Sequence, residues 1–265
     1  MVFRVFSGKM KILFIGDIIG RPGRQAVEKL LPGLVEEHQI DFVIANGENA
    51  AAGFGLTPAV LDNLFALGIN VVTSGNHLWD KKDILPRLKK EPRLLRPANY
   101  PPEVPGTRFG VFEDKQGRKV GVFNLLGRVF MPAVDCPFRV ADQVIAELKK
   151  ETDIIIVDMH AEATSEKIAL GWYLDGRVSA MIGTHTHVMT ADERVLPQGT
   201  AYITDAGMTG GFDSVIGMEK EPIIEKFLTQ LPTKFEVAEG DVRFNGVVVE
   251  VDEQSGKARR IERVT

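Results

Sequence analysis

Short apolar segments of this chain repeatedly end in a polar residue that can bind a metal ion, and helical stretches separate them. In an alternating α/β chain the carboxyl ends of the strands meet at one rim of a sheet, so donors that are distant in sequence can lie together. This pattern constrains the fold more than any other feature of the sequence. The donors at these strand ends are Asp17, Glu48, Asn76, His160, His185 and His187.

The order of apolar and turn-forming segments predicts an α/β chain. The expected strands cover residues 11–15, 41–45, 70–73, 153–157, 177–182 and 200–204. Helices are expected from Pro22 onward, over residues 58–67 and over residues 141–150. Two predicted hairpins, residues 107–125 and 241–263, add antiparallel strands, so the sheets should be mixed.

Composition excludes several classes of protein. Hydrophobic residues make up 44% of the chain and charged residues 26%, as in ordinary globular proteins. A net charge of -4 argues against extended nucleic-acid binding, and no apolar run has the roughly 20 residues of a membrane-spanning helix. The single Cys136 excludes an intramolecular disulfide. We therefore expect a small anionic ligand and no membrane partner. The single cysteine favours a cytoplasmic location. Assembly into a homo-oligomer stays open.

The domain organisation is expected to be simple. Residues 1–9 precede a second methionine, Met10, which opens directly onto the first strand. We interpret residues 1–9 as a leader or an extra N-terminal extension, with an ordered edge strand as the alternative. No segment between Met10 and Thr265 is long enough to serve as a linker, which predicts a single domain over residues 10–265.

The donor set indicates the kind of metal site. Three imidazoles, two carboxylates and an amide oxygen form a mixed nitrogen and oxygen set that suits iron, manganese or zinc better than magnesium. Six donors exceed the needs of a mononuclear catalytic site, so we expect two metal ions, with Glu48 as their bridge. Such a centre can hold a bridging hydroxide and attract a phosphate.

Some of these residues also have a purely structural interpretation. Asp17 could simply end a strand, and Asn76 could be a turn residue. His185 and His187 are two positions apart and would face opposite sides of a strand, so both can bind metal only if they lie on a turn. The combination of segments, more than any one residue, supports the metal site.

Several motifs carry a resemblance to a known family. The segments at Gly16-Asp17, Gly75-Asn76-His77 and Gly183-Thr184-His185-Thr186-His187 resemble the calcineurin-like metallophosphoesterases. The longer segments Asn46-Gly47-Glu48-Asn49, Leu126-Gly127-Arg128-Val129-Phe130-Met131 and the run of eight residues from His160 are similar to the bacterial YmdB-type phosphodiesterases. The resemblance covers the chain from about Met10 onward.

The resemblance implies a fold and an activity. The fold would be a four-layer α/β/β/α sandwich of two mixed β-sheets flanked by helices, with a di-iron or otherwise dinuclear centre. The activity would be hydrolysis of small cyclic nucleotides, notably 2′,3′-cyclic monophosphates, with 3′,5′-cyclic monophosphates as a second expected group. A hydroxide that bridges the metals would attack phosphorus.

Two departures from the wider metallophosphoesterase pattern concern the metal ligands. Ile19 stands where the first motif usually has a histidine, so Asn49 or water should complete that metal's coordination. Glu48 takes the place of the usual bridging aspartate. The resemblance also implies that His77 is not a ligand but protonates or stabilises the leaving oxygen, and Asp80 would orient its ring if the segment is helical.

Other residues are weaker candidates. Arg128 could bind phosphate or pair with a surface carboxylate, and Phe54 could stack on a nucleobase or pack on the core. Asp158 and Glu162 flank His160 and could tune it. Residues 208–218 contain several glycines and are expected to form a mobile loop near the rim.

Three functions remain open on this basis. The first is the metal-dependent phosphodiesterase described above. The second is a phosphomonoesterase or RNA-acting nuclease on the same centre. The third is a non-catalytic regulatory protein that senses a nucleotide.

Overall fold

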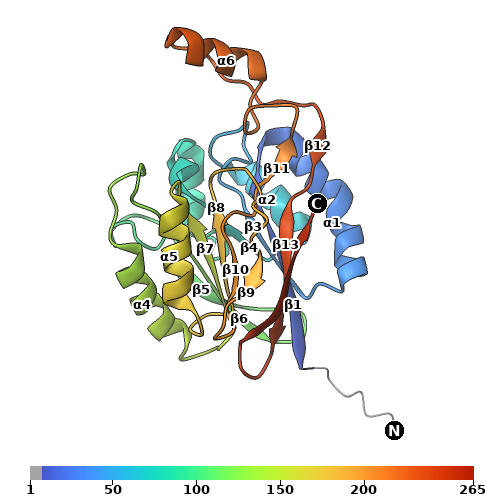
Figure 1. Ribbon diagram of the computed structural model, residues 1–265, viewed down its shortest axis with the longest axis vertical. Coiled ribbons are helices and arrows are strands. Elements are labelled where there is room, and N and C mark those ends of the chain that lie inside the picture. The colour runs from blue at the N-terminus through green and yellow to red at the C-terminus, as the bar shows by residue number, and fades with distance from the viewer. Residues whose placement is uncertain (1–7) are drawn as a thin grey trace.

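The structure, a computed structural model, describes residues 8–265 and contains a five-stranded mixed sheet in the order β14-β13-β1-β3-β4 (Figure 1). β1 pairs in parallel with β3 and antiparallel with β13, and all five residues of β3 are buried, as expected for a strand covered on both faces. The strands are β1 (Lys9–Ile15), β3 (Phe42–Asn46), β4 (Val71–Thr73), β13 (Gly246–Asp252) and β14 (Ala258–Val264).

A second mixed sheet has six strands in the order β5-β6-β7-β8-β10-β9. Its four inner strands are parallel and its two edge strands are antiparallel to their neighbours. These strands are β5 (Phe109–Glu113), β6 (Lys119–Leu126), β7 (Ile155–His160), β8 (Ala180–Thr184), β9 (Arg194–Val195) and β10 (Ala201–Ile203). A small third sheet joins β12 (Val242–Arg243), β11 (Met208–Gly211) and β2 (Asp17–Ile18).

Helices lie between the strands. The α-helices are α1 (Gly20–His38), α2 (Pro58–Ala66), α3 (Leu85–Leu88), α4 (Pro137–Leu148), α5 (Thr164–Leu174) and α6 (Lys220–Thr229). Two short 3₁₀ helices are η1 (Asn76–Trp79) and η2 (Lys82–Ile84). Thr57 caps α2 by accepting a hydrogen bond from the Val60 N–H, and Pro58 occupies the first turn, as the sequence predicts. No helix within residues 8–265 is both long and apolar enough to cross a membrane.

Alternating side chains divide the hydrophobic core into three clusters. One cluster contains residues of both large sheets, such as Phe14 and Ile156. A second joins the five-stranded sheet to α1 and α2, and a third joins the six-stranded sheet to α4 and α5, through residues such as Leu61 and Leu170. The predicted α/β class with mixed sheets is therefore confirmed.

Most element boundaries differ from the predicted ones by a few residues. The helix expected over residues 141–150 begins earlier, at Pro137, and β7 extends to include His160. Strand β1 begins at Lys9, one residue before Met10, while residues 1–7 of the predicted leader lie outside the described part of the chain.

The expectation of a mobile loop over residues 208–218 is wrong for its first part. Met208–Gly211 is strand β11, which is buried and pairs in parallel with β2. A Cβ atom at Gly211 would overlap the carbonyl group of Ala238, so this glycine allows close packing of two backbones.

Strand ends from both large sheets meet at one rim. Within the six-stranded sheet, His160 at the end of β7 is in register with Leu126 at the end of β6 and Thr184 at the end of β8. Within the five-stranded sheet, Asn46 at the end of β3 is in register with Thr73 at the end of β4. A hydrogen bond of 3.0 Å from Asn46 Nδ2 to Oδ2 of Asp158 in β7 joins the two sheets there.

Candidate metal centre

Glu48, His160 and His185 form the centre of the predicted site. One donor atom from each lies within 4.8 Å of the others. His160 Nε2 is 3.0 Å from Glu48 Oε1 and 3.1 Å from His185 Nδ1. Glu48 and His160 are fully buried, whereas His185 is partly exposed to the adjoining cavity. The three donor atoms are therefore close enough together to bind the same metal ion.

Asp17 lies beside this group and is also fully buried. Its Oδ2 accepts a hydrogen bond of 3.1 Å from the backbone N–H of His185. Its Oδ1 is 3.9 Å from His160 Nδ1 and has no hydrogen-bond partner among residues 8–265. Burial of a polar oxygen without a partner costs free energy, so this atom is suited to a cation.

Two amide side chains complete the predicted set. Asn49 Nδ2 lies 3.2 Å from Glu48 Oε1 and 3.3 Å from His187 Nε2. The Oδ1 atoms of Asn49 and Asn76 are buried and, like Oδ1 of Asp17, find no hydrogen-bond partner in the described part of the chain. His187 Nδ1 lies 2.9 Å from the carbonyl oxygen of Ile216.

The backbone after β8 forms the turn that the spacing of the two histidines requires. His185 and His187 both have positive φ angles, 97° and 66°, so neither continues the strand. Thr186 between them is held away from the centre, because Asp205 Oδ2 accepts hydrogen bonds from its N–H and its hydroxyl group. Both histidines can therefore face the same side.

The charges of the metal-free donors are tightly coupled. Burial by itself would raise the pKa of Glu48, but the positive charge of His160 lowers it well below its usual range. Burial would lower the pKa of His160, but the carboxylate of Glu48 raises it. Burial also raises the pKa of Asp17 to about 6 and lowers that of His185 to about 3. Without a metal ion, His160 thus carries the proton that balances Glu48.

The donors present fit a metal centre. The three buried oxygens of Asp17, Asn49 and Asn76 lack partners, and the remaining donors are imidazoles and one carboxylate, with no thiolate. This set matches iron, manganese or zinc. The residues that would hold the ions are Asp17, Glu48, Asn49, Asn76, His160, His185 and His187.

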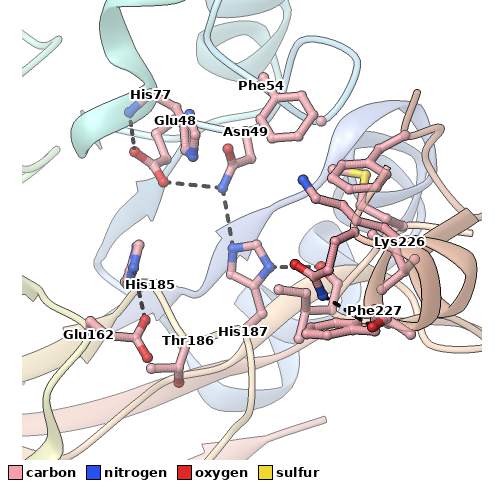
Figure 2. A pocket seen from close by; sticks show the side chains of 17 residues that line it. Glu48, Asn49, Phe54, His77, Glu162, His185, Thr186, His187, Lys226 and Phe227 are labelled. Atoms are coloured by element: carbon pink, nitrogen blue, oxygen red, sulfur yellow. Dashed lines mark hydrogen bonds and ion pairs between the residues drawn. The ribbon is translucent and has the colours of Figure 1, made fainter. Parts of the chain in front are cut away.

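A cavity of about 580 Å³ opens beside the donors, a size typical of a small-molecule site. Glu48, Asn49, His185 and His187 line it, and Figure 2 shows His187 between the donors and α6. The cavity therefore connects the candidate metal donors with the surface of the protein.

His77 and Phe54 also line this cavity. His77 Nδ1 lies 2.8 Å from Asp80 Oδ2; His77 lies within the 3₁₀ helix η1 and Asp80 directly follows it. The Phe54 ring packs edge-on against the His77 ring with centroids 5.2 Å apart. Asp80 therefore orients the imidazole, leaving Nε2 as the ring nitrogen free to meet a ligand.

Arg128 is not part of the cavity lining. Its side chain is exposed, and its backbone N–H donates to the carboxylate of Glu166 over 3.1 Å. A phosphate contact for Arg128 stays a prediction. Lys226 and Phe227 line the cavity from α6 but have no sequence signal, because nothing in a short helix indicates which distant strand ends it will face.

The mixed sheets, the buried donors at a strand-end rim and the adjoining cavity define a hydrolase of the phosphoesterase class. The chain belongs to the YmdB-like protein family, whose model matches residues 13–264. The predicted resemblance to the YmdB-type phosphodiesterases is thus confirmed.

Three known proteins are similar to this chain over nearly its whole length. The chain is 52% identical over 255 residues to a 2′,3′-cyclic-nucleotide 2′-phosphodiesterase of Bacillus subtilis, with 96% of each protein covered. A crystal structure of a hypothetical protein from Thermus thermophilus matches with a TM-score of 0.90 and 44% identity, over 96% of this chain and 98% of that one. A phosphatase structure from Mycoplasma pneumoniae also matches with a TM-score of 0.90, at 39% identity, over 97% and 92%. The predicted enzyme class, a phosphoric diester hydrolase, agrees with the name of the Bacillus protein.

Proposed function

We propose that this chain is a dinuclear metal-dependent phosphodiesterase that hydrolyses 2′,3′-cyclic nucleotides and, as a second group, 3′,5′-cyclic nucleotides. The observation that carries the proposal is the group of buried, unpartnered oxygens of Asp17, Asn49 and Asn76 around Glu48, His160 and His185. The name of the Bacillus relative supports the substrate class.

Seven side chains would hold the two ions, and Glu48 is the proposed bridge because its two oxygens face different partners. Oε1 faces His160 Nε2 at 3.0 Å, while Oε2 accepts a hydrogen bond of 3.0 Å from the backbone N–H of His77. When bound, two divalent ions lower the pKa of water and balance the charge of the phosphate. Iron is the proposed metal, with manganese and zinc as alternatives.

The remaining steps belong to the side chains of the cavity. Hydrolysis forms a bond between a water oxygen and phosphorus and breaks the bond from phosphorus to O2′, so O2′ needs a proton. His77 is the proposed donor, since Asp80 fixes its ring through Nδ1 and leaves Nε2 facing the cavity. Phe54, packed on His77, would contact the nucleoside.

The four layers of the fold are part of the same proposal. The core cluster that both large sheets share, and the helices on their outer faces, support the four-layer α/β/β/α sandwich. The cytoplasmic location, the single domain over residues 10–265 and the homo-oligomer stay predictions.

The test measures hydrolysis of 2′,3′-cyclic, 3′,5′-cyclic and linear nucleotides with metal content determined in the same samples. The metal-loaded protein should cleave 2′,3′-cyclic nucleotides fastest, and Asp17→Asn should lose bound metal and activity together. Faster cleavage of phosphomonoesters or of RNA would favour the second function. Two bound ions with no hydrolysis of any substrate would favour a nucleotide-sensing protein.

A further inference from the structure

Helix α6 stands apart from the sheets on a narrow base formed by the segments before and after it (Figure 1). The base consists of an antiparallel bridge between Met218 and Val237 and a hydrogen bond of 2.9 Å from the Glu219 N–H to the Glu236 carbonyl. Only Ile223 of the helix is buried. Packing against the body therefore does little to hold α6, whose position depends mainly on this base and on contacts around the cavity.

α6 supplies a wall of the cavity that differs from the metal centre. Phe227 and Ile223 of the helix line it together with Phe54 and Phe235, so this end is largely apolar. Figure 2 shows Glu48 and His185 on one side of the cavity and Lys226 and Phe227 on the opposite side. Phe227 is 75% exposed, so it is available to contact a ligand.

Among the described residues that line this cavity, Lys226 is the one lysine or arginine. Its Nζ lies 4.8 Å from the centroid of the Phe235 ring and points into the cavity (Figure 2). Among residues 8–265 no carboxylate forms an ion pair with it, in contrast to Lys220 and Lys234 of the same segment. An ammonium group in an apolar wall without a carboxylate partner is suited to bind an anion of the substrate.

In the proposed function the cleaved phosphate binds at the metal centre, on the other side of the cavity from Lys226. A ribonucleoside with one phosphate at the metal ions would lie across the cavity, with its base and sugar against the aromatic side chains. The group that projects from the far side of that sugar is O5′, and the anion it can carry is a second phosphate.

We propose that the α6 wall binds a second phosphate of the substrate through Lys226, so that the preferred substrate is a nucleoside with a 2′,3′-cyclic phosphate and a phosphate on O5′. This inference rests on the proposed function and specifies its substrate. The same chemistry occurs in a free 5′-phosphorylated cyclic nucleotide and at an RNA 3′ end that terminates in a cyclic phosphate.

The test compares kcat/KM for three substrates of the metal-loaded protein: adenosine 2′,3′-cyclic phosphate, its 5′-phosphorylated form, and a dinucleotide that ends in the same cyclic nucleotide. The second phosphate should raise kcat/KM about tenfold, mainly through KM, since it adds a charge-assisted contact. In Lys226→Gln the ratio of kcat/KM with and without the second phosphate should fall to about one. Lys226→Arg should retain the wild-type ratio. High salt should also lower the ratio.

Lys234→Gln is the matched control, because it removes the same charge from the same segment at a side chain that is 86% exposed and outside the cavity lining. It should keep the wild-type ratio. If the 5′-phosphorylated mononucleotide shows the full increase in kcat/KM, a free nucleotide is a sufficient substrate. If only the dinucleotide shows the increase, the substrate is an RNA end.

Two results would overturn the inference while leaving the proposed function in place. One is hydrolysis by the wild-type protein with no advantage from the second phosphate. The other is an equal loss on all three substrates in Lys226→Gln, which would assign Lys226 to the cleaved phosphate. Absence of hydrolysis of every cyclic substrate by the metal-loaded protein would instead overturn both.

Discussion

The hydroxyl group of Thr184 donates a hydrogen bond of 2.6 Å to Oδ1 of Asp158, and both residues are fully buried. The same hydroxyl oxygen lies 2.8 Å from Nδ1 of His160. Because a hydroxyl has a single proton and Asp158 takes it, Thr184 must accept a hydrogen bond from Nδ1–H. Nε2 of His160, which faces Glu48, is therefore the ring nitrogen that can bind a metal ion once its proton is displaced.

Replacement of Thr184 by valine should therefore weaken metal binding. The valine keeps the volume but removes the group that fixes the ring and its tautomer, and we expect a loss of about 10- to 100-fold in metal affinity. Thr184→Ser, which keeps the hydroxyl, should bind metal nearly as well as the wild type. Competition with a chelator of known affinity gives both values, and equal affinity in Thr184→Val and the wild type would contradict this role.

Gly75 should be intolerant of any side chain. A Cβ atom there would overlap Oε2 of Glu48 and Nε2 of His160, two of the proposed donor atoms. Gly75→Ala should thus reduce metal content and activity together. Gly33→Ala is the matched control, since nothing lies within 4 Å of its Cβ position and alanine is the better residue within α1 by about 1 kcal/mol. Full metal occupancy in Gly75→Ala, measured by elemental analysis, would show that the donors can shift.

Metal affinity should rise with pH. Binding needs a neutral His160 and an ionised Asp17, whereas in the metal-free protein the Glu48 carboxylate holds the pKa of His160 above its ordinary value of 6.5 and burial raises that of Asp17 to about 6. Metal binding near neutral pH therefore displaces a proton, and affinity should increase by up to about tenfold per pH unit there. Calorimetry in buffers of different ionisation enthalpy measures the proton directly; no release at pH 7 would contradict this coupling.

His77 should matter for turnover and not for metal binding. Loss of a general acid lowers the rate by about 10²- to 10⁴-fold, so His77→Ala should fall in this range with unchanged metal content. Asp80→Asn should have a smaller effect in the same direction, because it only weakens the orientation of the ring through its contact of 2.8 Å. A substrate with a better leaving group than ribose O2′ should restore much of the rate. Lost metal in His77→Ala would instead identify a ligand.

The strand-end donors could be predicted from sequence because their chemistry is local. Gly16-Asp17 and His160 each follow an apolar segment, and parallel strands bring such ends to one rim whatever the details of packing. The structure accordingly brings Asp17, Glu48, Asn49, His160 and His185 together. The need for a turn at His187 also followed from simple alternation along a strand.

Other features depend on contacts that no local pattern encodes. The glycines of residues 208–211 favour a loop, yet pairing with β2 and a close backbone approach make them a buried strand. The role of Thr184 is set by two neighbours on an adjacent strand, Asp158 and His160. The position of Lys226 depends on how α6 stands over a rim built from distant segments.

The pair of Lys167 and Asp205 should prove essential for stability. Lys167 Nζ lies 2.7 Å from Asp205 Oδ2, and neither side chain is more than 1% exposed. The same carboxylate fixes Thr186 between the two histidines. Lys167→Met leaves a buried carboxylate without its cation, which should cost about 3–5 kcal/mol of unfolding free energy and loosen the turn at His185.

The matched control is the exposed pair of Lys150 and Glu147, in which the two side chains are 65% and 55% exposed. Lys150→Met removes a surface ion pair and should change the unfolding free energy by less than about 1 kcal/mol. Urea unfolding of both variants in chelator gives the comparison without a contribution from bound metal. Similar midpoints for Lys167→Met and Lys150→Met would mean that Asp205 finds another partner, and the turn would then not depend on this buried pair.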